Sequence, residues 1–571
     1  MTAQTTQSTQ STFPWLKNYP AGVPHTVNPE QFKSLDQLLE TSFKTNANKP
    51  FSVCMDRWMR YAELDSCSAA LGAWIQSLNL EPHARVAIML PNIPQFAVAM
   101  AGILRAGFTC VNVNPLYTPR ELEHQLKDSG ATCIVILENF ASTLAEVIKK
   151  TQIKQVVIAS MGDLLGFWYG QWITFAVRHL AKIVPSYTFM LNEGVHVISF
   201  GEALEKGKTR ALQPSKTTLD SIAFLQYTGG TTGLSKGAVL THRNIIAAIL
   251  QSEAWFTPAL TRIGDVSKTN NIAALPLYHI FALTLCFLAI RWGSYLTLIP
   301  NPRDIDGFIT VLKRRPFHLL PAVNTLFNAL LQHPQFKTVD FSHLCVSQAG
   351  GMAASAGTAK QWLETTGCPM IEGWGMSETC AIGTNNPITN KEFTGSIGLP
   401  LPGIEIAIKN DAGLTLPLGN SGEICIRGPQ VMEGYYQQLI ETQKSFTNDG
   451  FMRTGDVGIM DENGYTKIID RIKDMILVSG FNVFPNELEN TISLCPGVLE
   501  CAAIGIPDDK QGEAIKIYVV KGEATLTEDD VADFCKQHLT GYKRPKYIEF
   551  RDELPKSNVG KILRRELRSS V

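Results

Sequence analysis

Short apolar segments that alternate between strand and helix patterns constrain the fold of this chain more than any other feature. Residues 84–90 have the continuous apolar character of a buried strand, residues 95–106 have helical spacing, and residues 133–137 are again strand-like. This alternation, which runs from about residue 51 to 198, is typical of parallel sheets covered by helices. We therefore predict an α/β fold that begins with a helix-covered sheet.

The remainder of the chain divides by composition. Residues 1–11 are nearly all Thr, Gln and Ser, which predicts a disordered tail. After residue 470 the pattern indicates a helix at 485–494, strands at 498–506 and 514–520, and a further helix opened by the capping pair Thr527 and Asp530. We predict a poorly ordered tail over 1–30, a large N-terminal domain over 31–470 and a small α+β domain over 471–571.

Charge and cysteine usage exclude some functional classes. The 51 Lys and Arg residues balance 52 Asp and Glu residues, so bulk charge does not indicate a nucleic-acid-binding protein. The 12 cysteines include no C-x-x-C pair and follow no secretory leader, so we expect reduced thiols in the cytoplasm. The longest apolar run, 280–290, is far shorter than the roughly 20 residues that cross a bilayer.

The densest chemical motif is a glycine- and hydroxyl-rich loop at 227–237. Glycines let main-chain amides approach an anion, hydroxyls add donors and a lysine adds positive charge; the residues involved are Thr228, Gly229, Gly230, Thr231, Thr232, Gly233, Ser235, Lys236 and Gly237. A plain glycine-rich hairpin is the alternative. The spacing does not match the G-x-x-x-x-G-K-[ST] phosphate loop, so we predict a different kind of phosphate-binding loop.

Five further motifs follow in order and carry a resemblance to a known family. They are Pro276-Leu-Tyr-His279, Gly373-Trp-Gly-Met-Ser-Glu378, Thr454-Gly-Asp456, Asp470-Arg-Ile-Lys-Asp474 and Pro555-Lys-Ser-Asn-Val-Gly-Lys561. From about residue 61 to 565 the chain resembles the adenylate-forming superfamily of acyl-CoA synthetases, acyl-adenylating domains and luciferases. Within it, the chain is most similar to bacterial long-chain fatty-acid–CoA ligases.

The resemblance implies a fold and a two-step reaction. The fold would add a distorted β-barrel to the large domain and make the small C-terminal domain mobile. A carboxylate attacks the α-phosphorus of ATP to give acyl-AMP and pyrophosphate, and the thiol of coenzyme A then displaces AMP. Both nucleophiles come from the substrates, so the protein has to position reactants and stabilise negative charge.

The resemblance also assigns nucleotide-binding roles. Glu378 and the Thr228 hydroxyl would bind Mg²⁺, a cation that prefers oxygen ligands. Ser377 would contact phosphate, and Trp374, where relatives often have tyrosine, would stack on adenine opposite Gly350 and Gly351, beside Gly375. Asp456 would accept hydrogen bonds from the ribose hydroxyls, with Arg471 near the sugar or a phosphate. For an isolated Trp, Asp or Glu, core packing, a turn or a solvated loop is the more common role.

Three further assignments concern catalysis and domain movement. Lys561 would bridge the carboxylate and the α-phosphate, and His279 would gate the acyl site at the start of the apolar segment 280–290. Lys473 would be the hinge of a domain rotation that brings Gly480 and Phe481 to the site for thioester formation. The alternatives are a solvent-facing lysine, a core histidine and a rigid linker ion pair.

Segment 161–184 combines aromatic and basic residues with helical spacing. Leu165, Trp168, Trp172, Phe175 and Ala176 share one face, and Gln171, Thr174, Arg178 and Lys182 form a polar stripe. An interfacial membrane helix and a buried helix both fit this pattern. The resemblance favours peripheral attachment to the inner face of the cell membrane, and it leaves the oligomeric state open, a homodimer included.

The expected substrates are a long-chain fatty acid, ATP and coenzyme A. Apolar residues near 280–290 favour a long aliphatic tail over acetate. The alternatives are an acyl-AMP ligase that loads a carrier protein, a ligase of medium-chain or aryl acids, and a nucleotide-binding membrane adaptor without activity. Retention of both Glu378 and Lys561 speaks against the adaptor.

Overall fold

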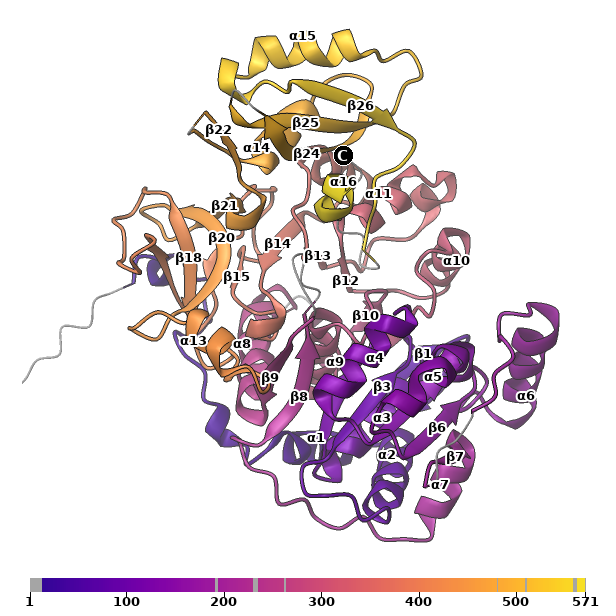
Figure 1. The fold of residues 1–571 in the computed structure, drawn as a ribbon. Coiled ribbons are helices and arrows are strands. Elements are labelled where there is room, and N and C mark those ends of the chain that lie inside the picture. The colour runs from indigo at the N-terminus through magenta and orange to yellow at the C-terminus, as the bar shows by residue number, and fades with distance from the viewer. Residues whose placement is uncertain are drawn as a thin grey trace, which may run out of the picture.

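Figure 1 shows the fold in a computed structural model of the chain. The structure describes residues 13–189, 194–228, 235–260, 263–479, 481–508, 511–557 and 562–569. Three sheets and their helices precede residue 472, and a fourth sheet with its helices follows it.

The first sheet has eight strands in the order β19-β9-β8-β4-β3-β5-β6-β7. Its parallel part confirms the predicted architecture: the strand expected at 84–90 is β3, and the one expected at 133–137 is β5. The strands are β3 (Arg85–Met89), β4 (Thr109–Asn112), β5 (Cys133–Leu137), β6 (Gln155–Ala159), β7 (His196–Ser199), β8 (Ile222–Tyr227), β9 (Gly237–Thr241) and β19 (Gly434–Tyr435).

Helices bury both faces of this sheet, and alternate side chains of one strand point into different cores. Val86 and Ile88 of β3 pack in the core that includes α2 (Tyr61–Gln76) and α3 (Pro94–Arg105). Ala87 and Met89 pack in the core that includes α4 (Pro119–Ser129) and α5 (Ala141–Val147). The period of two explains why β3 reads as a continuous apolar run.

The second sheet has nine strands in the order β16-β15-β14-β13-β12-β10-β11-β1-β2. The strands are β1 (Pro50–Cys54), β2 (Arg57–Arg60), β10 (Asn270–Ala273), β11 (Tyr295–Leu298), β12 (Leu319–Ala322), β13 (Val346–Ala349), β14 (Met370–Trp374), β15 (Thr384–Asn385) and β16 (Leu399–Pro400). The associated helices are α1 (Leu35–Thr45), α8 (His242–Leu260), α9 (Ile280–Trp292), α10 (Ile305–Arg314), α11 (Asn324–Gln332) and α12 (Ala356–Thr366). The apolar run at 280–290 is therefore most of α9, a buried helix.

A third, antiparallel sheet of four strands corresponds to the expected distorted β-barrel. Its order is β17-β18-β20-β21. The elements are β17 (Glu405–Lys409), β18 (Gly422–Arg427), β20 (Met452–Met460), β21 (Thr466–Arg471) and the nearby helix α13 (Leu439–Lys444).

The C-terminal unit is a five-stranded α+β structure, drawn in yellow tones at the top of Figure 1. The elements are β22 (Ile476–Val478), β23 (Phe481–Val483), β24 (Val498–Asp508), β25 (Gly512–Lys521), β26 (Tyr547–Arg551), α14 (Pro485–Ile492), α15 (Glu528–His538) and α16 (Arg564–Ser569). The predicted capping box is present: the Thr527 side chain accepts from the Asp530 N–H, and the Asp530 carboxylate accepts from the Thr527 N–H.

The segment 13–30 differs from the expectation of a poorly ordered tail. Trp15 is buried, Tyr19 Oη donates to the Pro400 carbonyl at 2.6 Å, and the Gly403 N–H donates to the His25 carbonyl. The Thr/Gln/Ser composition ends at residue 12, and the aromatic side chains after it supply apolar surface for docking. Residues 1–12 lie outside the described part of the chain.

Segment 161–184 contains a short surface helix, α6 (Phe167–Phe175), followed by one π-helical turn, η5 (Ala176–Leu180). Figure 1 shows α6 at the outer edge of the molecule. Trp168 is 83% exposed and Trp172 is 55% exposed, whereas Leu165 is buried. The alternative of a buried helix is therefore wrong for this chain. Among the described residues, no helix has the length and apolar character to cross a membrane.

Candidate active site

The glycine-rich loop joins β8 to β9, which pair as an antiparallel hairpin. Tyr227 pairs with Gly237, and the Thr228 N–H donates to the Lys236 carbonyl at 3.0 Å. The described ends of this segment thus form a β-hairpin, and a hairpin and a phosphate-binding loop do not exclude each other here. Gly229, Gly230, Thr231, Thr232 and Gly233 lie outside the described residues, so their contact with phosphate stays a prediction.

Lys236 is held at the end of this loop by a residue that sequence reasoning missed. Its Nζ lies 2.5 Å from Glu441 Oε2 of α13, and 5.2 Å from the centre of the Tyr435 ring. The lysine lowers the pKa of Glu441 to about 2. Glu441 therefore pairs with the positive charge that we predicted would bind phosphate.

Glu378 lies in the short helical turn Ser377–Thr379 that follows β14. Its carboxylate is buried, which raises its pKa, and Tyr435 Oη donates to its Oε1 at 2.7 Å. The Met432 N–H donates to the Glu378 carbonyl at 2.8 Å. Tyr435 thus contacts both charged groups of the candidate site, Glu378 and Lys236, and no periodicity or motif of the sequence pointed to it.

The backbone around Glu378 explains the glycine in its motif. Cys380 and Ala381 have φ values of 53° and 63°, so the chain turns sharply just after Glu378. A Cβ on Gly375 would lie 2.3 Å from the Ala381 carbonyl group, a distance no side chain tolerates. Gly375 therefore permits the turn that places Ser377 and Glu378 beside the loop.

Three predicted nucleotide-binding residues form one hydrogen-bonded cluster. Asp456 of β20 is buried, and its Oδ2 accepts from Trp374 Nε1 at 2.8 Å. Its Oδ1 lies 2.8 Å from Arg471 Nε, the residue opposite it on β21. The Trp374 indole N–H thus donates to the carboxylate that we predicted for ribose.

A cavity brings the predicted adenine-binding residues next to the predicted acyl gate. Its lining includes His279, Gly350, Gly351, Trp374 and Gly375. His279 is the N-cap of α9, where its Nδ1 accepts from the Phe281 N–H. Gly351 adopts a φ of +78°, which favours glycine. The two groups of residues, 70 or more positions apart in the sequence, therefore share one cavity wall.

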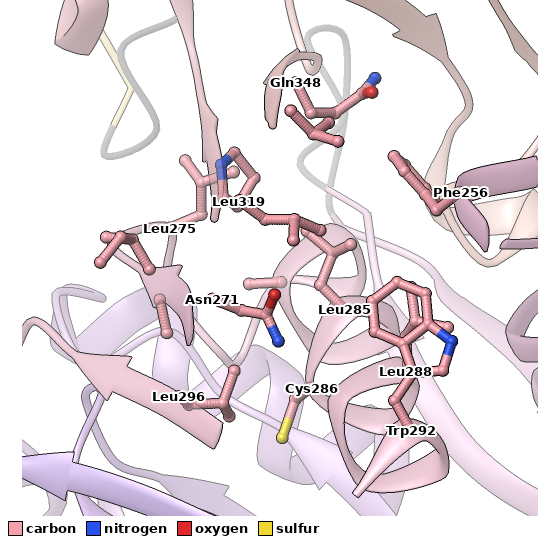
Figure 2. Close-up of a pocket in the computed structure, with 15 residues that line it drawn as sticks. Phe256, Asn271, Leu275, Leu285, Cys286, Leu288, Trp292, Leu296, Leu319 and Gln348 are labelled. Carbon is pink, nitrogen blue, oxygen red and sulfur yellow. The ribbon is translucent and has the colours of Figure 1, made fainter. Parts of the chain in front are cut away.

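A second cavity, shown in Figure 2, adjoins the first. Both are lined by Phe256, Leu285 and Gln348. The second cavity lies between α9 and strands β10 to β13. Its walls are almost entirely apolar, as a binding site for an aliphatic chain requires.

The remaining predicted residues lie at or after the junction of the two lobes. Lys473, in the turn Ile472–Asp474, has a pKa lowered by partial burial and by Arg471, while Asp474, Asp456 and Glu378 act in the opposite direction. Phe481 is exposed and stacks on Tyr542 at 4.8 Å. Gly480 and Lys561 lie outside the described residues, so their roles stay predictions.

The donor set at Glu378 suits a hard divalent cation. A buried carboxylate is present, and the hydroxyl-bearing Thr228 follows β8 directly. Magnesium commonly binds proteins through one or two oxygen ligands and takes the rest from phosphate and water. Within the described ranges, three or more His, Cys, Asp or Glu side chains do not gather as a metal site.

Comparison with known proteins agrees with this geometry. The chain matches the AMP-binding enzyme family over residues 39–436 and the AMP-binding enzyme C-terminal domain over residues 487–561. It is 48% identical to a long-chain-fatty-acid–CoA ligase of Yersinia pestis over 97% of both chains. It is also 48% identical to the Escherichia coli O6:H1 protein of that name over 98% of both chains, and 33% identical to the one from Bacillus subtilis.

Solved structures share the fold. ATP-bound MatB from Rhodopseudomonas palustris superposes with a TM-score of 0.78 at 26% identity, over 94% of this chain and 98% of that one. The anthranilate CoA ligase AuaEII in complex with anthranoyl-AMP gives a TM-score of 0.81 at 24% identity, over 95% of this chain and 99% of that one. On its motifs, its fold and these matches, the chain belongs to the AMP-binding enzyme family.

Proposed function

We propose that the chain is an AMP-forming long-chain fatty-acid–CoA ligase. The observation that carries the proposal is the cavity bordered by His279 and Trp374, because Trp374 donates to Asp456 and because the cavity shares lining residues with the apolar cavity. A nucleotide and an aliphatic chain thus have adjoining sites. The near-half identity to curated long-chain-fatty-acid–CoA ligases over the whole chain supports the same reaction.

Nucleotide binding follows from the charged and aromatic groups. Asp456, held by Trp374 and Arg471, would accept from the ribose hydroxyls with its remaining lone pairs, while the Trp374 ring stacks on adenine. The loop amides, Thr228, Ser377 and Lys236 would hold the phosphates. Glu378 and Thr228 would hold Mg²⁺, which supplies positive charge to the triphosphate.

Adenylation needs an in-line attack, and the protein positions its two reactants. One carboxylate oxygen of the acid bonds to the α-phosphorus as the bond to pyrophosphate breaks, and Lys561 would stabilise the negative charge shared by the acid and the α-phosphate. In the second step, the deprotonated thiol of coenzyme A attacks the acyl carbonyl and AMP leaves. Lys561 then has to withdraw, which is the reason for a rotation about Lys473.

The acyl chain would enter the apolar cavity past Leu285, a residue shared by both cavities. We expect Leu285→Trp to block this passage because the larger side chain fills it. Activity with palmitate should fall by at least about 10-fold, the effect of roughly 1.4 kcal/mol, whereas activity with octanoate should change less. Equal losses with both acids, measured as kcat/KM, would contradict this path.

The product assay tests the function directly. The purified protein is incubated with palmitate, ATP, Mg²⁺ and coenzyme A, and the products are separated by mass. Palmitoyl-CoA, AMP and pyrophosphate are expected. Palmitoyl-AMP without thioester would instead indicate an acyl-AMP ligase for a carrier protein, and the absence of both products would indicate a binding protein without activity. A series of acids that includes medium-chain and aryl members defines the preferred substrate.

We also propose that α6 attaches the protein to the cytoplasmic face of a membrane. Phe167, Trp168 and Trp172 are more than half exposed, and such side chains bind at the boundary between headgroups and acyl chains. Arg178 Nε donates to the buried Glu138 carboxylate at 2.8 Å, which anchors the segment to the body of the protein. Attachment would bring the enzyme to the layer in which long-chain acids dissolve.

A further inference from the structure

The deep part of the acyl cavity contains two polar atoms without a partner. Asn271 is 6% exposed, and its Nδ2 donates to Ser294 Oγ at 2.9 Å, but its Oδ1 accepts no hydrogen bond from the described residues. Trp292 is 7% exposed, and its Nε1 donates to none of them. Both side chains line the cavity, as Figure 2 shows.

The third polar residue of the wall is different. Gln348 Oε1 accepts from Asn385 Nδ2 at 3.2 Å, and its Nε2 donates to the Ala349 carbonyl at 3.2 Å. The other lining residues are apolar, Leu275, Leu285, Leu288, Leu296 and Leu319 among them. The unpaired atoms therefore belong to Asn271 and Trp292 alone within this lining.

These two residues lie far from the reacting end of the substrate. Asn271 is in the first half of β10, whereas His279 follows the carboxyl end of that strand. Helix α9 begins directly after His279 and ends at Trp292. Because a helix of 13 residues is about 20 Å long, Trp292 lies about that far along the helix from His279. A fatty acid with its carboxylate near His279 would thus bring its tail toward Asn271 and Trp292.

An unpaired buried polar atom is unfavourable in a site built for a plain hydrocarbon. Leaving such an atom unsatisfied destabilises the folded protein, a cost that a leucine at the same place would avoid. A hydroxyl group removes the penalty, because it can donate to Asn271 Oδ1 or accept from Trp292 Nε1. The rest of the wall offers a hydrocarbon chain the apolar contacts it needs.

We propose that the deep end of this cavity binds a hydroxyl group at the far end of the acyl chain, so that long-chain hydroxy acids are substrates. The inference rests on the proposed ligase function and extends its substrate class. Asn271 is the residue that selects the hydroxyl group, and Trp292 offers a second unpaired polar group in the same lining.

The test compares saturated acids from decanoic to stearic with their ω-hydroxy counterparts. For each length, kcat/KM for acyl-CoA formation by the full-length enzyme is measured, and the ratio of hydroxy to plain acid is plotted against length. We expect the wild-type ratio to pass through a maximum at the length that brings the hydroxyl to Asn271. Asn271→Leu should lower that maximum of the hydroxy-to-plain ratio by about 3- to 10-fold, the value of one neutral hydrogen bond.

Two further variants complete the test. Trp292→Phe should lower the same maximum by a smaller factor, because it removes the N–H group and keeps the ring. Leu296→Ile, an apolar change on the same wall, should leave the ratio unchanged.

Either of two results would overturn the proposal: a wild-type ratio that does not vary with length, or the same maximum in Asn271→Leu as in the wild type. A flat profile is also what a trapped water at Asn271, or an asparagine that serves only Ser294, would give. The wild-type profile decides the matter even where Asn271→Leu does not fold. Failure of the wild type to convert any plain acid would instead contradict the ligase function.

Discussion

Lys236 pairs with Glu441, whose carboxylate lies 2.5 Å from its ammonium group. Both side chains are about one-third exposed, so solvent screens the pair and its net contribution to stability is small. A triphosphate has to replace Glu441 as the partner of the lysine. We therefore expect Glu441→Gln to tighten ATP binding by about 2- to 5-fold, measured by calorimetry.

Lys444→Gln is the matched control, because it removes the other cationic partner of Glu441 and leaves Lys236 paired. Weaker ATP binding by Glu441→Gln would show that the carboxylate holds Lys236 in its binding position and does not compete with phosphate.

Glu372, one residue before the Gly373–Glu378 motif, is a buried carboxyl group whose burial raises its pKa to about 7. The unfolded chain, in which a Glu has a pKa near ~4.3, loses this proton first as the pH rises. The stability contribution of the neutral group is therefore complete below about pH 4.3 and is lost as the pH rises through about 7.

Glu372→Gln removes this dependence and keeps an oxygen for the Ala354 N–H, which donates to Glu372 Oε1 at 2.9 Å. Relative to the wild type, we expect the variant to gain roughly 1–3 kcal/mol of unfolding free energy between pH 5 and pH 8. Denaturant-induced unfolding of both proteins at pH 5 and at pH 8 measures this difference in unfolding free energy. The same gain in Glu364→Gln, a change at an exposed position of α12, would assign the effect to net charge.

At the scale of elements, α6 is distinguished by apolar side chains that the rest of the chain does not cover. Burial of one large apolar side chain in a membrane is worth about 1.5–3 kcal/mol. We expect Trp168→Ser with Trp172→Ser to weaken binding to anionic phospholipid vesicles by at least about 10-fold, with the fold intact because both side chains are exposed.

Vesicle binding is measured by sedimentation with the vesicles. The control is the double variant Leu414→Ser with Leu418→Ser, which removes two exposed leucines near the third sheet. Unchanged vesicle binding by the tryptophan variant, together with a change in its sedimentation coefficient, would assign α6 to contact between copies of the chain.

At the scale of the whole molecule, one junction joins the two lobes. Asp470 of β21 accepts from the Asn486 N–H at 2.8 Å, and Arg564 of α16 lies 3.3 Å from Asp474 and 2.6 Å from Glu489. The Asp470 contact crosses from β21 to the C-terminal unit, and the two contacts of Arg564 lie within that unit, beside Lys473. A rotation between the two steps would have to rearrange or carry them, so the two half-reactions should respond differently to changes in that unit.

Lys561→Ala is the sharpest such change. We expect it to lower acyl-AMP formation by at least about 100-fold, because a charge that stabilises the transition state is lost, and to leave thioester formation from supplied acyl-AMP nearly intact. The control is Lys556→Ala, a change in the same motif as Lys561. Lys556 pairs with Glu500, so its loss should affect neither step strongly. Equal losses of both half-reactions, measured in single turnovers, would contradict the role of Lys561.

The sequence by itself determined the fold class and the ends of several strands and helices, and its motifs singled out the residues that we predict to carry the chemistry. Strand β5, helix α3 and the Thr527 capping box are encoded by neighbours in the chain, and Glu378 and Asp456 are found by motifs of a few residues. The prediction of a poorly ordered tail does not describe residues 13–30. The surface on which Trp15 and Tyr19 dock is built from distant segments, which a local pattern cannot reveal.

Only the tertiary structure decided the partners of those residues. Tyr435 and Glu378 are 57 positions apart, Trp374 and Asp456 are 82 apart, and Lys236 and Glu441 are 205 apart. The acyl cavity likewise takes its walls from α9 and four strands that the chain reaches separately. Local pattern fixes which side chains face inward, but packing of whole elements fixes which of them meet, because that depends on sheet order and helix position.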